Sequence, residues 1–244
     1  MILHGLLGML DNWLTFGKLL SQENQVFLID QRNHGRSAHD PRMSYSDMVS
    51  DLKKFMQEHQ LNGGATLIGH SMGGKTAMQF VFDHPSLVTN LIVIDIAPRE
   101  YNASHSHIFE ILSDISLENI RSRRELEALI NNALGDARMA SFLMKNLRRS
   151  DLGYEWKMNL TVLRKAYYQL LQAPNLRHSE AYQGTAVFYR GADSDYIRDA
   201  DEKLIKGYFP NSEIITVPNA GHWLHVDNLR FFLDNVKKQL NVGK

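Results

Sequence analysis

The chain has 244 residues and no cysteine, and 27 Lys plus Arg are balanced by 27 Asp plus Glu. This length allows one α/β domain with an insertion, and the balanced charge provides no field that would attract nucleic acid or an anionic membrane. The missing cysteines exclude disulfides, thiolate metal sites and a cysteine nucleophile. Because the sequence has neither a signal-peptide pattern nor a membrane-spanning apolar run, we expect a cytoplasmic protein without a membrane partner.

The first residues predict the end of a buried strand at Ile2-Leu3, followed by the loop His4-Gly5-Leu6-Leu7-Gly8. A mixed sheet of this kind normally opens with an antiparallel hairpin before this point. We therefore expect the first strands to be missing, and the sequence leaves open whether Met1 is the natural start. A helix carrying Trp13, Phe16 and Leu20 inward should follow.

From there to residue 98, β-rich runs alternate with helical patterns. Strands are predicted over 26–30, 66–70 and 91–95, and helices over 44–59 and from residue 76. Strands that alternate with helices predict a mostly parallel sheet with helices on both faces.

Residues 99–183 interrupt this alternation. They show helical periodicity, clearest over 125–134, 139–147 and 161–171, and no strand pattern. Strands resume at 186–189 and 213–217, and an amphipathic helix over 229–240 closes the chain. The sequence therefore predicts a core made of residues 1–98 and 184–244, with 99–183 inserted as an all-helical cap.

The strand at 66–70 runs into Gly69-His70-Ser71-Met72-Gly73 and then into a helix. A Gly-x-Ser-x-Gly turn between a strand and a helix is typical of the nucleophile elbow of an α/β-hydrolase fold. Ser71 would then be exposed above the sheet as a nucleophile. The backbone N–H of Met72 would point to the place where charge develops on an attacked carbonyl.

Two other interpretations fit the same residues. Gly69-x-x-x-x-Gly74-Lys75-Thr76 matches a P-loop, with Asp95 as a possible Mg²⁺ ligand. This alternative predicts ATP binding through Lys75, but it leaves the other motifs unexplained. Ser71 could also be a simple helix N-cap.

A serine nucleophile needs a base, and in this fold the base follows the last strand. His222, in the loop Pro218-Asn219-Ala220-Gly221-His222, is the favoured candidate, and His225 is the alternative. His105 and His107 form a His-x-His pair without a nearby acidic ligand, so we expect surface residues and no metal or other cofactor.

Three aspartates could orient the base: Asp95, Asp193 and Asp195. The usual acid stands three residues after the glycine that ends the penultimate strand. Counted from Gly191, that residue is Ser194, which cannot supply a charge. Asp95 closes the strand next to that of Ser71 and is favoured, with Asp195 and Asp193 as alternative acids.

The second donor of an oxyanion hole should come from the loop after the first strand. Leu6 is the candidate, and Met72 supplies the other N–H. His4 is expected to hold this loop by hydrogen bonds. Asp30, Arg32 and His34 are expected to brace the same edge of the sheet.

These motifs together resemble the small bacterial YbfF-type esterases of the α/β-hydrolase superfamily. The resemblance rests on residues 4–8, 30–35, 69–75, 94–98 and 219–223, in that order. It implies hydrolysis of short-chain carboxylic esters, and also of acyl-CoA thioesters. It also implies Asp95 as the acid, because relatives carry the matching aspartate. This chain departs from its relatives at Asp193 and Asp195, where they tend to be uncharged, so these two residues stay as alternative acids.

The expected function is that of a serine carboxylesterase acting on a small-molecule ester or thioester through an acyl-enzyme. Cap residues Phe109, Leu143, Trp156 and Tyr167 are candidates for the wall of an acyl pocket. The alternatives are a lyase or C–C bond hydrolase of the same fold (menaquinone-pathway or meta-cleavage type) and a non-catalytic ligand-binding homologue. The sequence does not determine the oligomeric state.

Overall fold

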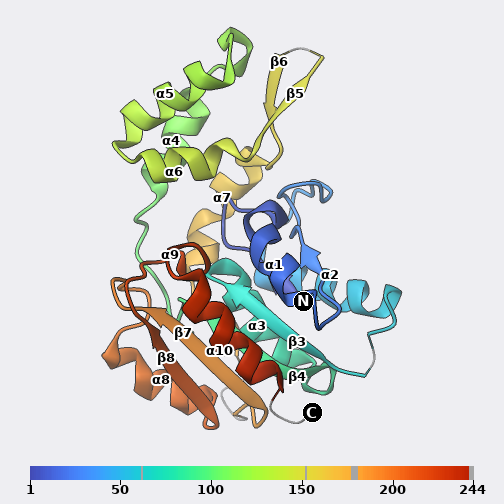
Figure 1. The fold of residues 1–244 in the computed structure, drawn as a ribbon. Coiled ribbons are helices and arrows are strands. Elements are labelled where there is room, and N and C mark those ends of the chain that lie inside the picture. Colours follow the sequence, from blue (N-terminus) through green and yellow to red (C-terminus); the bar gives the residue numbers. More distant parts are fainter. Residues whose placement is uncertain (62, 152, 177–180, 242–244) are drawn as a thin grey trace.

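The computed structural model describes residues 1–61, 63–151, 153–176 and 181–241. Its centre is a six-stranded sheet in which every pair of neighbouring strands is parallel (Figure 1). The predicted parallel sheet is therefore confirmed. In spatial order the strands are β2 (Leu28–Ile29), β1 (Ile2–Leu3), β3 (Ala65–His70), β4 (Val88–Ile94), β7 (Thr185–Gly191) and β8 (Ser212–Val217).

Alternating side chains of the buried strands enter two separate cores. In β4, Leu91 and Val93 join the cluster formed with α2 (Tyr45–Glu58) and α3 (Met72–Asp83), whereas Ile92 and Ile94 join the cluster formed with α1 (Leu14–Leu20) and α10 (Leu229–Asn241). Successive side chains of a strand point to opposite faces, so an apolar run of this kind belongs to a strand that is covered on both sides. The sheet thus forms the middle of three layers.

The helices of these outer layers all precede β4 or follow β7. None of the described helices is long and apolar enough to cross a membrane. They are α1 (Leu14–Leu20), α2 (Tyr45–Glu58), α3 (Met72–Asp83), α8 (Glu202–Tyr208), α9 (Leu224–Asp227) and α10 (Leu229–Asn241), with short 3₁₀ turns at Leu10–Trp13, Pro85–Leu87 and Asp199–Asp201.

The start of α2 shows how local sequence sets these boundaries. The Ser44 hydroxyl accepts a hydrogen bond from the backbone N–H of Asp47 at 3.1 Å, which satisfies one of the free donors at a helix start. Met48, Leu52 and Met56 follow on the buried face. The predicted helix over 44–59 is confirmed to within one residue at each end.

The segment between β4 and β7 departs from the prediction. Its described residues form four α-helices, but they also form an antiparallel hairpin that pairs Leu147 with Trp156, so the expectation of an all-helical insertion is wrong. Each hairpin strand has four residues, too few for strand alternation to stand out in the sequence. Residues 177–180 of the insertion lie outside the described part. The elements are α4 (Ser106–Asp114), a 3₁₀ turn (Leu117–Asn119), α5 (Arg123–Leu134), α6 (Ala137–Met144), β5 (Leu147–Ser150), β6 (Gly153–Trp156) and α7 (Leu160–Leu171).

These inserted elements have their own apolar core, which includes Leu126, Ile130, Leu143 and Leu163. In Figure 1, α4, α5, α6 and the hairpin lie together at one end of the molecule, and α7 lies between them and α3. Ser71, which directly follows β3, and several residues of the insertion line one cavity.

Candidate active site

Ser71 occupies the bend between β3 and α3 with φ 52° and ψ −117°. This conformation is unfavourable for a residue with a Cβ and costs on the order of 1–3 kcal/mol. The bend is tight: a Cβ on Gly69 would lie 2.3 Å from the carbonyl oxygen of Gly73. Packing of strand against helix thus holds the strained serine in place, at the wall of a cavity.

This geometry argues against the P-loop interpretation. β3 and α3 meet in a sharp bend and do not open into a wide cradle of backbone N–H groups. The Nζ of Lys75 donates hydrogen bonds to the carbonyl oxygens of Leu171 and Gln172, at 2.8 and 2.6 Å. The ammonium of Lys75 is therefore hydrogen-bonded to the inserted segment.

His222 lies in the loop between β8 and α9, and its Nδ1 is 2.8 Å from Oδ2 of Asp95. The carboxylate accepts this hydrogen bond, so Nδ1 carries the proton and Nε2 keeps its lone pair. The ring of Tyr196 stacks on the imidazole, with centroids 3.9 Å apart. The imidazole is thus fixed in orientation and tautomer, as a general base requires.

Asp95 directly follows β4 and is fully buried. Two groups from the end of β7 donate to its carboxylate: the backbone N–H of Gly191 to Oδ1 at 3.1 Å and the hydroxyl of Ser194 to Oδ2. Buried charge is tolerated where hydrogen bonds replace water. Ser194, which occupies the position of the usual acid, therefore holds by a hydrogen bond the carboxylate that the neighbouring strand supplies.

The other two aspartates are placed differently. Asp193 and Asp195 belong to the described residues, have exposed side chains and make no hydrogen bond to His222. Asp195 lines the cavity. Of the three candidate acids, the structure brings only Asp95 to the imidazole.

Ser71 and His222 line the same cavity. Among the described residues, no group is hydrogen-bonded to the Ser71 hydroxyl, so the contact with Nε2 of His222 is not formed in this conformation. Hydrogen bonds of this type are often long without substrate and tighten in the complex.

Leu6 and Met72 also line the cavity. Met72 is the first residue of α3, where backbone N–H groups have no partner within the helix. Neither the N–H of Leu6 nor that of Met72 donates to a described residue. Two residues with free backbone N–H groups therefore line the cavity that Ser71 also lines.

Two buried histidines hold the loop that carries Leu6. The backbone N–H of Leu7 donates to Nε2 of His34 at 3.2 Å, and that of Gln31 donates to Nε2 of His4 at 3.0 Å. Each ring uses Nδ1 as a donor to a carbonyl oxygen, so both are neutral. Burial lowers the pKa of His4 to about 4 and that of His34 to about 3. These contacts agree with the structural role expected for both residues.

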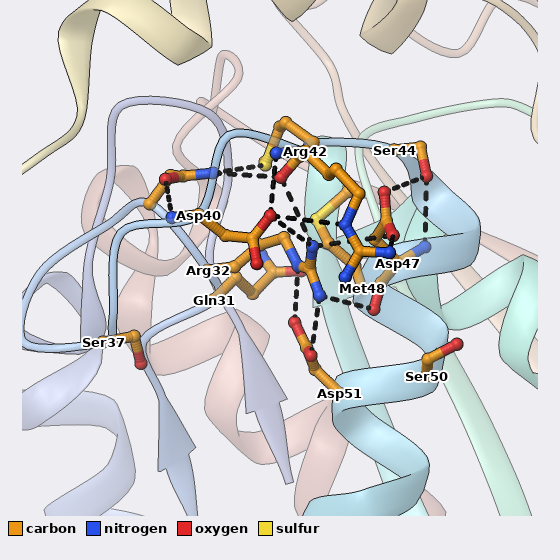
Figure 2. A network of polar contacts seen from close by, with 12 residues as sticks. Gln31, Arg32, Ser37, Asp40, Arg42, Ser44, Asp47, Met48, Ser50 and Asp51 are labelled. Atoms are coloured by element: carbon orange, nitrogen blue, oxygen red, sulfur yellow. Dashed lines mark hydrogen bonds and ion pairs between the residues drawn. The ribbon is translucent and has the colours of Figure 1, made fainter.

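The neighbouring loop is braced by ion pairs. The Arg32 guanidinium binds the carboxylate of Asp51 through two N–H groups, at 2.6 and 2.8 Å, with Asp40 and Asp47 close by (Figure 2). Asp30 accepts hydrogen bonds from the backbone N–H groups of Leu10 and Arg36. Asp30 and Arg32 thus brace this edge, as the sequence predicts, and neither lines the cavity.

Two further buried histidines, His70 and His225, lie near His222. Nε2 of His70 donates to the carbonyl oxygen of His222 at 2.9 Å, and His225 stacks on Trp13 with centroids 3.8 Å apart. Burial lowers the pKa of His225 to about 3, so it stays neutral. His225 is buried and also lines the cavity, but of the two candidate bases the structure brings only His222 to a carboxylate.

The cavity has a volume of about 710 Å³ and lies between the sheet edge and the inserted segment. Of the four predicted wall residues, Tyr167 lines it, whereas Phe109, Leu143 and Trp156 belong to the apolar core of the insertion. His105 also lines the cavity, while His107 is exposed. Within the described residues no cluster of metal-ligating side chains occurs.

Sequence reasoning missed several contributors to this site. Ser194 donates a hydrogen bond to Asp95, and Tyr196 stacks on His222. His70 donates a hydrogen bond to the backbone of His222. Position could have indicated Ser194, since it stands where an acid is usual. The partners of His70 and Tyr196 arise from long-range packing and leave no local signal.

Comparison with known proteins agrees with this geometry. Residues 1–229 match the family described as "alpha/beta hydrolase fold". The sn-1-specific diacylglycerol lipase ABHD11 of Mus musculus is 33% identical over 96% of this chain and 78% of its own length. Esterase YbfF of Escherichia coli is 30% identical over 98% of this chain and 92% of its own. A solved marine microorganism esterase superposes with a TM-score of 0.93 at 39% identity, covering 97% of this chain and 93% of that one.

Proposed function

Because the chain belongs to the α/β-hydrolase family and is a hydrolase acting on esters, we propose that it is a serine carboxylesterase whose catalytic triad is Ser71, His222 and Asp95. The observation that carries this proposal is the Asp95–His222 hydrogen bond of 2.8 Å beside the cavity into which the strained elbow presents Ser71. A serine hydroxyl becomes a nucleophile when an oriented base accepts its proton.

In the first half of the reaction, Nε2 of His222 takes the proton of Ser71 as Oγ attacks the ester carbonyl carbon. Asp95 stabilises the imidazolium and holds its orientation. The proton then passes from Nε2 to the leaving alcohol, the carbon–oxygen bond to the alcohol breaks, and the acyl group stays on Ser71.

The N–H groups of Leu6 and Met72 are proposed to bind the oxyanion of the tetrahedral intermediate. Both are free and lie on the same cavity wall as Ser71. Donors that are already in place need no reorganisation when charge develops, and one such donor is typically worth about 10²–10³-fold in kcat. Water then repeats the sequence on the acyl-enzyme, with His222 again as base, and releases the acid.

We further propose that residues 99–183 act as a cap on a core of residues 1–98 and 184–244. Tyr167, His105 and Met139 bring cap side chains to the cavity wall. A cavity of about 710 Å³ accommodates a small-molecule ester. Short-chain carboxylic esters and thioesters are the proposed substrates, since both present the same electrophilic carbonyl to Ser71.

Hydrolysis of p-nitrophenyl acetate and labelling by a fluorophosphonate test this proposal. Both should be lost in Ser71→Ala and retained in Ser50→Ala, whose hydroxyl only donates to the Ser46 carbonyl on the exposed side of α2. Activity of Ser71→Ala equal to that of the wild type would refute the mechanism. A wild type that is inactive on oxygen esters and thioesters but cleaves a C–C bond would favour the lyase or C–C hydrolase alternative.

A further inference from the structure

Lys75 is a buried cation that the proposed mechanism does not use. It lies one helical turn after Ser71 on α3, its side chain lines the cavity, and it is only 2% exposed. No carboxylate of a described residue pairs with it. A buried amine without a carboxylate partner is costly, so its surroundings should show what it contributes.

The Lys75 ammonium binds the carboxyl end of the cap helix α7. Nζ donates to the carbonyl oxygens of Leu171, the last residue of α7, and Gln172, its C-cap. These carbonyls have no partner within the helix and carry the negative end of the helix dipole. A cation at this point therefore satisfies the helix end and ties it to the helix of the nucleophile.

Two tyrosines complete this attachment. The hydroxyl of Tyr45 donates to the carbonyl oxygen of Leu170 at 2.6 Å, and the backbone N–H of Tyr101 donates to that of Leu171 at 3.0 Å. Nζ of Lys75 lies 4.9 Å from the centre of the Tyr101 ring and 5.9 Å from that of Tyr45. The aromatic faces add cation–π attraction to the hydrogen bonds. We refer to Tyr45, Lys75, Tyr101, Leu170 and Leu171 as the α7 clamp.

All five clamp residues line the cavity. The clamp thus closes one side of the space beside Ser71, and the position of the α7 end sets how much room remains there. An acyl group bound to Ser71 must fit within that room. One methylene more or less on a substrate in a hydrophobic pocket typically changes kcat/KM about 10–200-fold.

Resting on the proposed esterase function, we infer that Lys75 is a specificity-determining residue: its ammonium holds α7 against α3 and thereby limits the length of the acyl group that reaches Ser71. The clamp acts through the position of α7 and not through the reacting atoms. Its loss changes the preference among substrates and leaves the attack of Ser71 intact.

The first test compares p-nitrophenyl esters with acyl chains from acetyl to decanoyl in the wild type and in Lys75→Met. Met keeps the apolar stem and loses the charge and the N–H donors. In Lys75→Met, the ratio of kcat/KM for the octanoyl ester to that for the acetyl ester should rise by about tenfold relative to the wild type.

Two further variants serve as controls for the Lys75→Met measurement. Lys165→Met removes an exposed lysine from the same helix and should leave the ratio unchanged. Tyr45→Phe removes the hydrogen bond to Leu170 and should raise the ratio less than Lys75→Met does. An unchanged or reduced ratio in a folded Lys75→Met protein overturns the inference. Absence of ester hydrolysis in the wild type would instead overturn the proposed function.

A second test needs no loss of packing. Burial, reinforced by Arg99 and opposed by Glu100, lowers the pKa of Lys75 to about 7. The other titratable groups that face it are Tyr45 and Tyr101, and burial raises the pKa of both phenols, so they stay neutral. Of the groups around Nζ, only Lys75 therefore changes charge near neutral pH.

The ratio between two acyl esters removes any pH dependence that the two reactions share, because the same catalytic groups serve both substrates. In the wild type the octanoyl-to-acetyl ratio should rise from about pH 6 to about pH 8, as the ammonium loses its proton. In Lys75→Met the ratio should be flat over this range. A flat wild-type ratio, or an equal slope in both proteins, overturns the role of the ammonium.

Discussion

Asp95 and His222, 127 positions apart in the chain, are joined by a hydrogen bond of 2.8 Å between Oδ2 and Nδ1. Asp95 follows β4, next to the strand that leads into Ser71, whereas the usual acid of this fold follows the penultimate strand. The end of β7 supplies donors to this carboxylate through Gly191 and Ser194. The end of β4 therefore supplies the acid, and the end of the neighbouring strand β7 supplies the hydrogen bonds that orient it.

Asp95→Asn should abolish most of the activity. The amide cannot stabilise the imidazolium and favours the wrong tautomer, so kcat should fall by about 10⁴-fold with little change in KM. Initial rates on p-nitrophenyl acetate measure this. Asn also tolerates the positive φ of 48° at this position, so the fold should persist by circular dichroism.

Asp195→Asn and Asp193→Asn are the matched controls, since both side chains are exposed and neither reaches His222. Both should keep kcat within about threefold of the wild type. A large loss in either one, together with a mild effect of Asp95→Asn, would mean that the acid is located after β7 during turnover.

Ser194→Ala should give an intermediate effect. The hydroxyl donates to the same carboxylate oxygen that His222 binds, so its loss leaves the acid less firmly oriented. A hydrogen bond to a charged group is worth about 1.5–3 kcal/mol, and we expect kcat to fall about tenfold, less than in Asp95→Asn. Recovery in Ser194→Thr, which restores the hydroxyl, separates orientation from loss of packing; equal rates in all three proteins would contradict the role.

Much of this site could be predicted from the sequence because its parts are local. The strand–Gly-x-Ser-x-Gly–helix pattern fixes the elbow, and chain order puts His222 after the last strand. The acid stayed open between Asp95, Asp193 and Asp195, because all three end strands at the same edge. Only the folded positions of the β4 and β7 ends decide which carboxylate reaches the imidazole.

Other features of the structure could not be predicted from the sequence, for physical reasons. The hairpin of Leu147 and Trp156 has strands of four residues, and its pairing is decided by packing against cap helices. The partners of Lys75 are backbone carbonyls 96 and 97 residues away, and carbonyls leave no mark in a sequence. In the sequence alone, the same lysine therefore also fits the P-loop pattern of the alternative interpretation.

Gly5→Ala should damage catalysis through the oxyanion loop. A Cβ at this position would lie 3.0 Å from Nδ1 of His70 and 3.3 Å from Cβ of Ser71, so the loop carrying Leu6 must shift. Displacing one oxyanion donor is expected to lower kcat by about 10²-fold. The variant should still react with a fluorophosphonate, but more slowly.

The control for Gly5→Ala is Gly207→Ala in α8, where a Cβ meets no atom within 4 Å. Gly207 lies in the last turn of α8, so alanine there should raise the free energy of unfolding by at most about 0.5–1 kcal/mol and leave kcat unchanged. Urea unfolding measures the first and ester hydrolysis the second. Equal kcat in Gly5→Ala and the wild type would show that the loop can accept a side chain.

The buried neutral histidines should make stability depend on pH. Burial lowers the pKa of His4 to about 4 and that of His34 to about 3, well below the unfolded value of 6.5. Between these values the unfolded chain binds more protons than the folded one, so the free energy of unfolding rises with pH. Each histidine contributes up to about 1.4 kcal/mol per pH unit in this window, with the full stability present above pH 6.5.

Urea unfolding at a series of pH values from neutral to about pH 4 tests this, because acidification should lower the midpoint progressively. His34→Gln should reduce the slope, since it removes one buried base, and should also lower stability at neutral pH, since it removes the imidazole that accepts the hydrogen bond from the Leu7 N–H. His107→Gln changes an exposed side chain and should leave the slope as it is. A slope unaffected by His34→Gln would mean that His34 titrates alike in the folded and unfolded chains, and that the loop carrying Leu6 does not depend on a neutral imidazole.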